Sequence, residues 1–152
     1  MGKVCELALE FKKKFPNTVA RRIKKHSKVI EEYVNPDEEV LYAFCGQKGN
    51  ELSDFFRTCV VAVTDKRLLI GQKRVVWGSF YSQITPELYN DMQVYSGLFF
   101  GKATIDTVKE KLYISGLSKS SLDEIETAIS QLMINNNDLK QTLSRAGIPM
   151  RI

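Results

Sequence analysis

The sequence has few of the side chains from which catalytic and metal sites are most often built. Among its 152 residues there are one histidine, three cysteines and one tryptophan. Cys5, Cys45 and Cys59 form no CxxC pair, which excludes the usual zinc motifs, and their odd number favours reduced thiols in a reducing compartment. Cys45 and Cys59 lie in apolar runs, where a buried thiol acts as a small hydrophobe. The sequence also lacks any apolar run of the ~18 residues that a membrane-spanning helix needs.

Motifs of the common enzyme classes are absent too. The sequence contains no GxxxxGK[ST] phosphate loop, no GxSxG nucleophile turn and no HExxH zinc helix. The single histidine, His26, lies in a basic segment that disfavours its protonation and offers it no carboxylate partner. Asp65 and Asp106 are interpreted as a turn former and an exposed strand residue. We therefore predict a noncatalytic protein that uses no metal, no cofactor and no small-molecule substrate.

Positive charge is concentrated in the N-terminal fifth of the chain. Residues 1–35 contain nine basic and four acidic side chains, whereas the other 117 residues contain 13 basic and 14 acidic ones. The formal net charge of +4 therefore comes from this segment, and charge concentrated in this way favours anionic partners. The candidate polyanion-binding residues are Lys12, Lys13, Lys14, Arg21, Arg22, Lys24, Lys25 and Lys28.

Two interpretations of this basic segment remain open. In the first, which we favour, an apolar stripe packs on the rest of the protein and the charged face is simply solvated. In the second, the segment attaches the protein to an anionic membrane, where each Lys or Arg contributes about 1 kcal/mol. The second is weakened because residues 17–34 contain no Trp or Leu to insert. Nucleic acid is an unfavoured partner, because no stacking aromatic side chains alternate with the basic ones.

Hydrophobic periodicity predicts two helices near the N-terminus. A short one is expected over residues 4–13. A longer amphipathic helix is expected to begin after Asn17 or Thr18, either of which can cap it, and to end at Asn35-Pro36, because proline and the residue before it leave helical geometry. The apolar stripe of the longer helix consists of Val19, Ile23, Ile30 and Val34.

Between residues 39 and 117 the pattern changes to short β-rich runs separated by turn residues, which predicts an antiparallel sandwich or barrel. Alternation in residues 58–64 and 102–108 predicts a sheet with one buried and one solvated face. The apolar runs Phe55-Phe56 and Leu98-Phe99-Phe100 are interpreted as core and sheet-edge packing. The seven runs cover residues 40–47, 55–63, 67–72, 75–84, 88–96, 98–108 and 111–117.

A further helix is predicted after Ser118 or Ser120, because acidic residues in its first turn favour a helix N-terminus. The three asparagines at 135–137 are expected to end it, and residues 139–145 could add a short helix. The apolar stripe of the helix that follows Ser118 or Ser120 must be buried against another part of the protein, and we expect it to pack on the open end of the barrel. The stripe consists of Leu122, Ile125, Ile129, Leu132 and Met133.

Three stretches carry a family resemblance: VAVTDKRLLI (61–70) across a hairpin, FYSQI (80–84), which is similar to the segment that follows the family's fourth strand, and LFFGKATI (98–105), which is similar to its sixth strand. With the order of elements, they resemble the bacterial pleckstrin-homology-like (PH-like) family, YokE-like branch, over about residues 17–134. The resemblance implies an α+β fold, a seven-stranded antiparallel β-sandwich or barrel capped by a C-terminal helix, here preceded by an amphipathic helix. It also implies a bacterial or phage origin and a binding module for phosphoinositides, peptides or proteins.

A phosphoinositide site is disfavoured. The resemblance implies cations at the end of the first strand and along the second, since several must converge on the ring phosphates. Here that hairpin offers only Lys48 and Arg57, Phe55 stands where a cation is expected, and Glu51 and Asp54 add negative charge. Lys48 and Arg57 are therefore a weak headgroup site.

Three parts are expected along the chain: a basic N-terminal segment (1–35), a PH-like domain with its C-terminal helix (36–134) and a tail (135–152). The leading hypothesis is protein–protein interaction or self-assembly, because an exposed edge strand over residues 88–96 can pair with a partner strand. Peripheral attachment to an anionic membrane is the alternative. We expect a cytoplasmic protein, because the first residues show neither a secretory signal nor a myristoylation motif. The candidate protein-contact residues are Trp77, Tyr81, Tyr89 and Tyr95.

Overall fold

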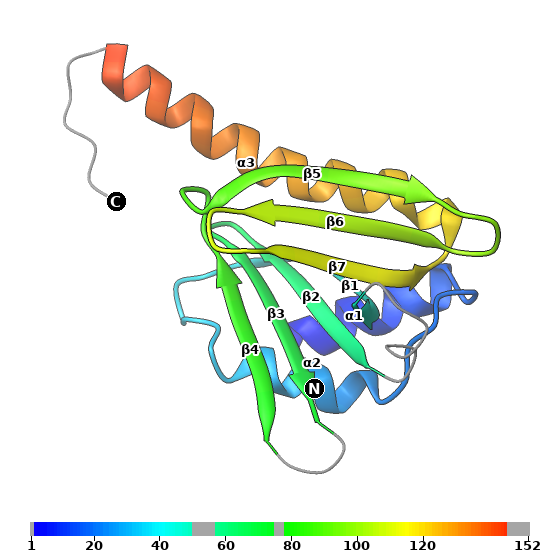
Figure 1. Cartoon of the computed structure of the whole chain (residues 1–152). Coiled ribbons are helices and arrows are strands. Elements are labelled where there is room, and N and C mark those ends of the chain that lie inside the picture. Colours follow the sequence, from blue (N-terminus) through cyan, green and yellow to red (C-terminus); the bar gives the residue numbers. More distant parts are fainter. Residues whose placement is uncertain (1, 50–56, 75–77, 146–152) are drawn as a thin grey trace.

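The computed structural model describes residues 2–49, 57–74 and 78–145, and over residues 135–145 it describes the helix backbone (Figure 1). The helices are α1 (Lys3–Lys14), α2 (Ile23–Glu31), the short 3-10 helix η2 (Lys119–Ser121) and α3 (Leu122–Arg145). The strands are β1 (Val40–Lys48), β2 (Thr58–Thr64), β3 (Leu68–Lys73), β4 (Ser79–Ile84), β5 (Tyr89–Ser96), β6 (Gly101–Thr107) and β7 (Lys111–Leu117).

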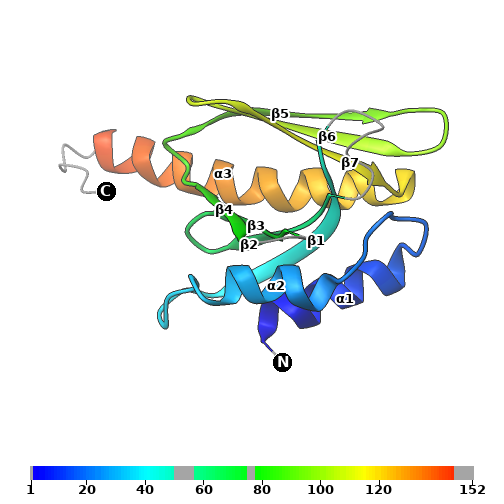
Figure 2. The same ribbon diagram turned by 60° about the horizontal axis from the view of Figure 1, so that its bottom comes forward.

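The strands form one bent antiparallel sheet in the order β4-β3-β2-β1-β7-β6-β5. Figure 2 shows four layers: the β5–β7 half of the sheet, then α3, then the β1–β4 half, and finally α1 with α2. Helix α3 fills the inside of the bend and buries its whole predicted stripe. The predicted α+β fold, seven antiparallel strands with a C-terminal helix and a preceding N-terminal helix, is confirmed.

Strand β2 is buried on both faces, since every residue from Thr58 to Thr64 is buried. The prediction of a solvated face was therefore wrong for this strand. The reason is that α2 packs on the face opposite α3, and helix and sheet approach so closely that a Cβ on Gly71 would lie 2.6 Å from Ile30 Cγ1. Strand β6 does show the predicted alternation, with buried and half-buried residues in turn.

Helix α2 begins at Ile23, several residues after the predicted start. Arg22 has φ 56°, in the left-handed region, so the chain turns sharply there before the helix begins. The residues expected to be its first turn bind the sheet instead: Val19 N donates to Gly116 O (2.8 Å) and Ser118 N donates to Thr18 Oγ1 (3.3 Å). These long-range hydrogen bonds override the local helical pattern. The predicted short helix before it is confirmed as α1.

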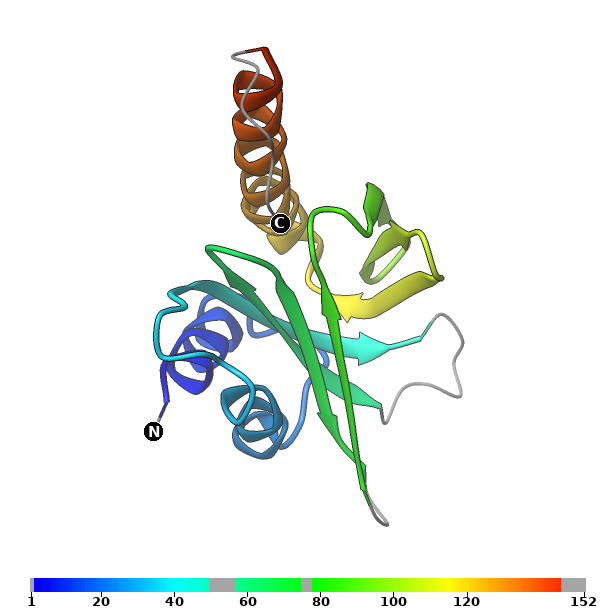
Figure 3. The same ribbon diagram turned by 90° about the vertical axis from the view of Figure 1, so that its left-hand side faces the viewer.

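Helix α3 does not end at the three asparagines but continues through them to Arg145. Asparagine costs only about 0.7 kcal/mol relative to alanine inside a helix, which is too little to stop a helix that is already formed. The next strong helix breaker in the sequence is Gly147. Figure 3 shows the last turns of α3 projecting beyond the sheet.

The apolar run 98–100 lies in the turn between β5 and β6 and is exposed, so its interpretation as core and edge packing was wrong. Leu98 is 82% exposed and Phe99 78% exposed. The turn is closed by a hydrogen bond from Gly97 N to Phe100 O (2.9 Å), and side chains at such a turn have no layer above or below them. Residues 55 and 56, the other run given this interpretation, lie outside the described residues.

Candidate functional site

The basic segment forms α1, α2 and the connection between them, and both helices pack on the sheet through their apolar sides. Val4, Ala8 and Phe11 of α1 and Ile23 and Ile30 of α2 are buried in the core. The cations face outward, as the favoured interpretation of the segment predicts, and those that are exposed are Lys13, Lys14, Arg21, Arg22, Lys24, Lys25 and Lys28.

Lys12 and Lys14 are among the predicted cations that have partners within the protein. Lys12 is half-buried, and its ammonium group donates to Pro16 O (2.7 Å) and Thr18 O (2.5 Å), which closes the C-terminal end of α1. Lys14 Nζ lies 2.5 Å from Glu124 Oε1 and so connects α1 to the first turn of α3. These two lysines therefore also serve the fold.

The weak headgroup site is only partly described. Lys48 N donates to Arg57 O (2.7 Å), so the two residues lie opposite each other where β1 and β2 meet the loop that joins them. The ammonium group of Lys48 lies 4.3 Å from the centroid of the Phe80 ring, a cation–π contact that turns it towards β4. Residues 50–56 of the loop lie outside the described residues. No convergence of cations is seen in the described part of this hairpin.

The predicted protein-contact residues that the structure describes lie on two strands that do not pair with each other, and they differ in exposure. Tyr81 on β4 stacks on Tyr33 at 3.7 Å between ring centroids, and it is half-buried. Tyr89 on β5 is half-buried as well, and burial raises the pKa of its hydroxyl. Tyr95 is 64% exposed near the end of β5. Since β4 and β5 are at the two ends of the strand order, no strand pairing joins Tyr81 to Tyr95. Trp77 lies outside the described residues.

His26 is buried and connects α2 to β3. It is 4% exposed, and its Nδ1 accepts a hydrogen bond from Lys73 N (2.8 Å) on β3. Burial, followed by the nearby Arg22 charge, lowers its pKa to about 4, so the ring is neutral at pH 7. The depressed protonation predicted from the basic segment is therefore found, with burial as its main cause.

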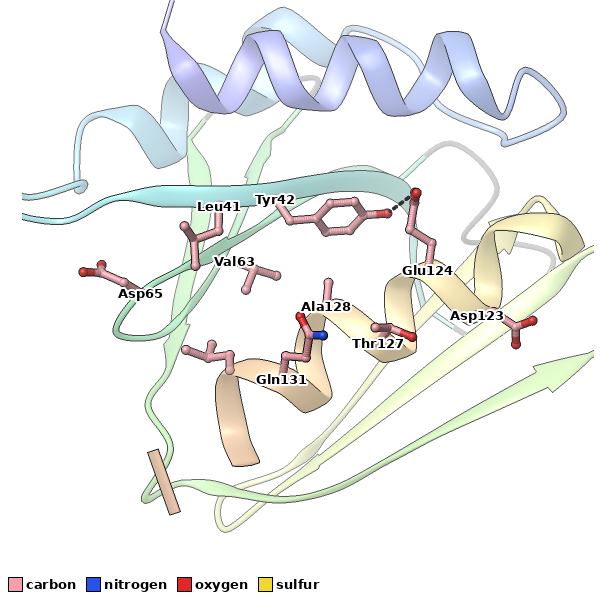
Figure 4. Close-up of a pocket in the computed structure, with 10 residues that line it drawn as sticks. Leu41, Tyr42, Val63, Asp65, Asp123, Glu124, Thr127, Ala128 and Gln131 are labelled. Carbon is pink, nitrogen blue, oxygen red and sulfur yellow. Dashed lines mark hydrogen bonds between the residues drawn. The ribbon is translucent and has the colours of Figure 1, made fainter. Parts of the chain in front are cut away.

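A cavity that the sequence did not reveal lies between the β1–β2 side of the sheet and α3 (Figure 4). Its volume is about 610 Å³, within the range of about 300–1,000 Å³ typical of ligand sites. We call it the β1–α3 cavity. Its lining comes from the start of β1, the end of β2, the turn after β2 and one side of α3, and consists of Leu41, Tyr42, Val63, Asp65, Asp123, Glu124, Thr127, Ala128, Gln131 and Leu132.

The lining is apolar inside and acidic at its edge. Val63 and Leu132 are buried, whereas Leu41 is 52% exposed. Three of the ten lining residues are acidic (Asp65, Asp123 and Glu124), and the lining contains no Lys, Arg or His. An apolar surface beside carboxylates suits a ligand that combines apolar groups with positive charge.

The polar groups of the cavity are held in place by hydrogen bonds. Tyr42 OH donates to Glu124 Oε2 (2.9 Å), while Lys14 binds the other oxygen of the same carboxylate. Burial, followed by this hydrogen bond, raises the pKa of the Tyr42 hydroxyl far above its usual value, so the phenol stays protonated and acts as a donor. At the far side, Asp65 Oδ1 accepts from Glu39 N (3.0 Å). Because these hydrogen bonds fix the polar groups of the cavity, a ligand would meet them already in position.

Sequence reasoning missed this cavity because each lining residue had a simpler explanation. Asp123 and Glu124 were interpreted as acids at a helix N-terminus and Asp65 as a turn former. These local roles were reasonable, and nothing in the sequence distinguishes Leu41, which the structure leaves 52% exposed, from the buried apolar residues of the same strand. Only the packing of α3 inside the bent sheet brings the lining residues of α3 together with those of β1, β2 and the turn after β2.

Within residues 2–49, 57–74 and 78–145, no group of three or more His, Cys, Asp or Glu side chains is placed to hold a metal ion. In the same described part of the chain, no helix is both long enough and apolar enough to cross a membrane.

Comparison with known proteins identifies a family and a solved structure that are similar to this chain. Residues 34–131 match the family described as "Bacterial PH domain", a match that begins after α2 and ends within α3. The chain is also similar in structure to a crystallised pleckstrin homology domain from Shewanella amazonensis SB2B, with a TM-score of 0.50 and 17% sequence identity over 77% of this chain and 92% of that one. At that identity the likeness concerns the fold. No curated protein sequence matches the chain significantly.

Proposed function

This chain belongs to the bacterial PH domain family, and on that premise we propose that it is a noncatalytic module that binds a segment of another protein in the β1–α3 cavity. PH-like domains commonly mediate binding, and the family match supports that general role. The proposed ligand is a peptide segment that places an apolar side chain inside the cavity and a Lys or Arg beside its carboxylates.

The cavity is the observation that carries this proposal. Leu41, Val63, Ala128 and Leu132 give it apolar walls, and removing an apolar side chain from water into such walls stabilises a complex by about 25 cal/mol per Å² of buried surface. Phosphoinositides are disfavoured, because Asp65 and Asp123 of the lining would repel their phosphates, although the carboxylate of Glu124 is already paired with Lys14. A positively charged peptide meets complementary charge at the same position.

The β5 edge offers a second surface for the same kind of function. Strand β5 ends the strand order, pairs with β6, and carries the exposed Tyr95. A partner strand or a second copy of the chain could pair with its outer backbone groups. Self-assembly at this edge, membership of the YokE-like branch and a cytoplasmic location are retained as proposals.

Attachment to an anionic membrane through the N-terminal helices is a second candidate function. It is favoured by the cations that α1, α2 and the connection between them present to solvent, among them Lys13, Arg22, Lys24, Lys25 and Lys28. Exposed Lys and Arg near acidic lipid contribute about 1 kcal/mol each, and salt screens them.

Selection from a library of random displayed peptides tests the leading proposal. We expect the selected peptides to combine Lys or Arg with a large apolar residue, and synthetic copies to bind the full chain. Ala128→Phe, which fills the cavity, and Asp123→Lys, which reverses the charge of its edge, should each weaken binding at least about tenfold, equivalent to about 1.4 kcal/mol.

Glu126→Lys is the matched control, because Glu126 is exposed on the same helix but does not line the cavity. It should leave peptide binding unchanged. The proposal fails if no peptide is selected, if the selected peptides lack positive charge, or if the Asp123 and Glu126 variants behave alike.

A further inference from the structure

The turn between β5 and β6 presents the most exposed large apolar side chains in the described part of the chain. Leu98 is 82% exposed, Phe99 78% and Phe100 38%, and Tyr95 beside them is 64% exposed. We call residues 97–100 the β5–β6 tip. Single exposed apolar residues are common, but adjacent large ones at the end of a hairpin mark a surface that is covered in function.

Two lysines lie at the base of the tip, and the acidic first turn of α3, with Asp123 and Glu124, begins beyond them. No acidic residue occurs in residues 92–105 or in residues 111–122, which include the end of β7 and η2. Lys119 Nζ donates to Leu98 O (2.7 Å), and Lys102 Nζ lies 5.8 Å from the centroid of the Tyr95 ring. The tip therefore consists of apolar side chains with two lysines at its base.

The backbone of the tip is partly prepared for an apolar environment. The Gly97 N to Phe100 O hydrogen bond closes the turn (2.9 Å), and the Lys119 ammonium group satisfies the Leu98 carbonyl. An unpaired backbone group costs several kcal/mol in hydrocarbon, so these two contacts lower the cost of placing the turn there. Lys119 can keep its charge at the headgroup level while its stem extends along the apolar surface.

The tip and the C-terminal end of α1 lie at the same end of the molecule, on the right in Figures 1 and 2. Contacts connect them: Lys119 binds Leu98, the neighbouring Ser118 binds Thr18 after α1, and Lys14 of α1 binds Glu124 of α3. The last turn of α1 is Lys12-Lys13-Lys14. The fold thus brings an apolar hairpin to the end of a basic helix more than eighty residues away in the sequence.

We propose that the β5–β6 tip inserts into an anionic membrane surface, with Leu98 and Phe99 in the interfacial region and the surrounding lysines at the acidic headgroups. A lipid surface is the chosen occupant because the apolar side chains of the tip are exposed and two lysines, Lys102 and Lys119, lie at its base, a combination that acidic lipid complements. The inference does not rest on peptide binding in the β1–α3 cavity. The β5–β6 tip supplies large apolar side chains that can insert, which residues 17–34 lack.

Co-sedimentation of the full chain with vesicles tests the inference. The wild-type protein should sediment with vesicles that contain phosphatidylglycerol and remain in solution with pure phosphatidylcholine. The double variant Leu98→Asn with Phe99→Asn should bind the anionic vesicles at least about tenfold more weakly, since two apolar side chains of the tip no longer leave water. Both are exposed, so the variant should keep the wild-type melting temperature.

Val108 provides a matched control, because it is a 64% exposed apolar residue in the turn between β6 and β7. Val108→Asn should bind as the wild type does. A tryptophan at the tip, Phe99→Trp, should add blue-shifted fluorescence on anionic vesicles, whereas Val108→Trp should not. The inference is overturned if the wild-type protein ignores anionic vesicles, if the tip double variant binds normally, or if the Phe99→Trp signal does not shift.

Charge reversal of Arg21, Arg22, Lys24 and Lys25 separates the tip from the helices. If this change abolishes vesicle binding while the tip double variant keeps it, the helices alone attach the protein and the tip proposal is wrong. If the tip double variant instead changes only self-association or peptide binding, the tip contacts protein and the proposal is wrong as well.

Discussion

Arg67 connects the β2–β3 hairpin to the loop before β1. Its Nε donates to Glu38 Oε2 (2.9 Å) and its Nη2 donates to Tyr33 O (2.9 Å). Thr64 Oγ1 also donates to Glu38 Oε2 (2.7 Å). The VAVTDKRLLI stretch that carried the family resemblance is therefore a folding device: its Thr and Arg anchor a buried carboxylate.

Glu38 is expected to stabilise the protein only in its charged form. The hydrogen bond from Arg67 is the main cause that lowers its pKa to about 2 from the usual 4.5. Glu38→Gln should lower the free energy of unfolding by about 2 kcal/mol near neutral pH, because Arg67 loses its anion. A depressed pKa stabilises the folded state above the unfolded pKa, and this contribution disappears as the pH falls from about 4.5 towards 2.

Urea unfolding of both proteins at a series of pH values measures this effect. The difference in stability between wild type and Glu38→Gln should be constant above about pH 4.5 and should shrink towards pH 2. A difference that stays the same across that interval would contradict the assigned role of the Glu38 charge.

At the scale of elements, local pattern and long-range contact compete. The seven strands were predicted from short β-rich runs, because alternation and turn residues act locally. The start of α2 was not predicted correctly. Thr18 and Val19 form hydrogen bonds with residues at the end of β7 and just after it, and the residues next to them in the sequence give no sign of these contacts. The exposure of Leu98 and Phe99 was not predicted either, since both lie in the closed turn between β5 and β6 and in neither strand.

Helix α2 is joined to β3 by a histidine that must remain neutral. Because the folded pKa of His26 is about 4 and its usual value is 6.5, the unfolded chain takes up a proton first as the pH falls. The contribution of neutral His26 is therefore complete above about pH 6.5 and is lost as the pH falls through this interval towards 4.

His26→Asn removes this titration while leaving a side-chain oxygen that can accept from Lys73 N. We expect the variant to be less stable than the wild type near neutral pH, with a smaller loss of stability between about pH 6.5 and 4. Chemical unfolding across that range measures both slopes. Equal slopes would mean that His26 does not titrate with folding.

At the scale of the whole molecule, the N-terminal helices complete a core that the family match does not include. The matched region begins at residue 34, after α2. Yet Phe11 packs near Tyr42 and Phe44 of β1, with ring centroids 6.3 and 6.0 Å away, and Ile30 is fully buried. The outer face of the β1–β4 half is therefore apolar and covered.

Deleting residues 1–31 should leave that face in water, and we expect the remaining chain to unfold or aggregate. Core side chains cost about 2–5 kcal/mol each when truncated, so the loss of several exceeds the stability of a typical domain. Circular dichroism and size-exclusion chromatography measure the outcome. Lys24→Glu with Lys25→Glu, on the exposed side of α2, is the control and should remain folded and monodisperse. A deletion variant with the wild-type melting temperature would contradict this prediction.

The sequence by itself determined the seven strands, the apolar stripes of the helices and the uneven charge, because these depend on periodicity and composition. Only the tertiary structure decided which surfaces remain available. Packing α3 inside the bend of the sheet created the β1–α3 cavity from residues that are far apart in the sequence, and Leu98 and Phe99 remained exposed in the turn between β5 and β6. Packing α1 and α2 on the other face buried β2 completely and brought the lysines of α1 to the end of the molecule that carries the β5–β6 tip. Both outcomes depend on contacts between residues far apart in the chain, which no local pattern encodes.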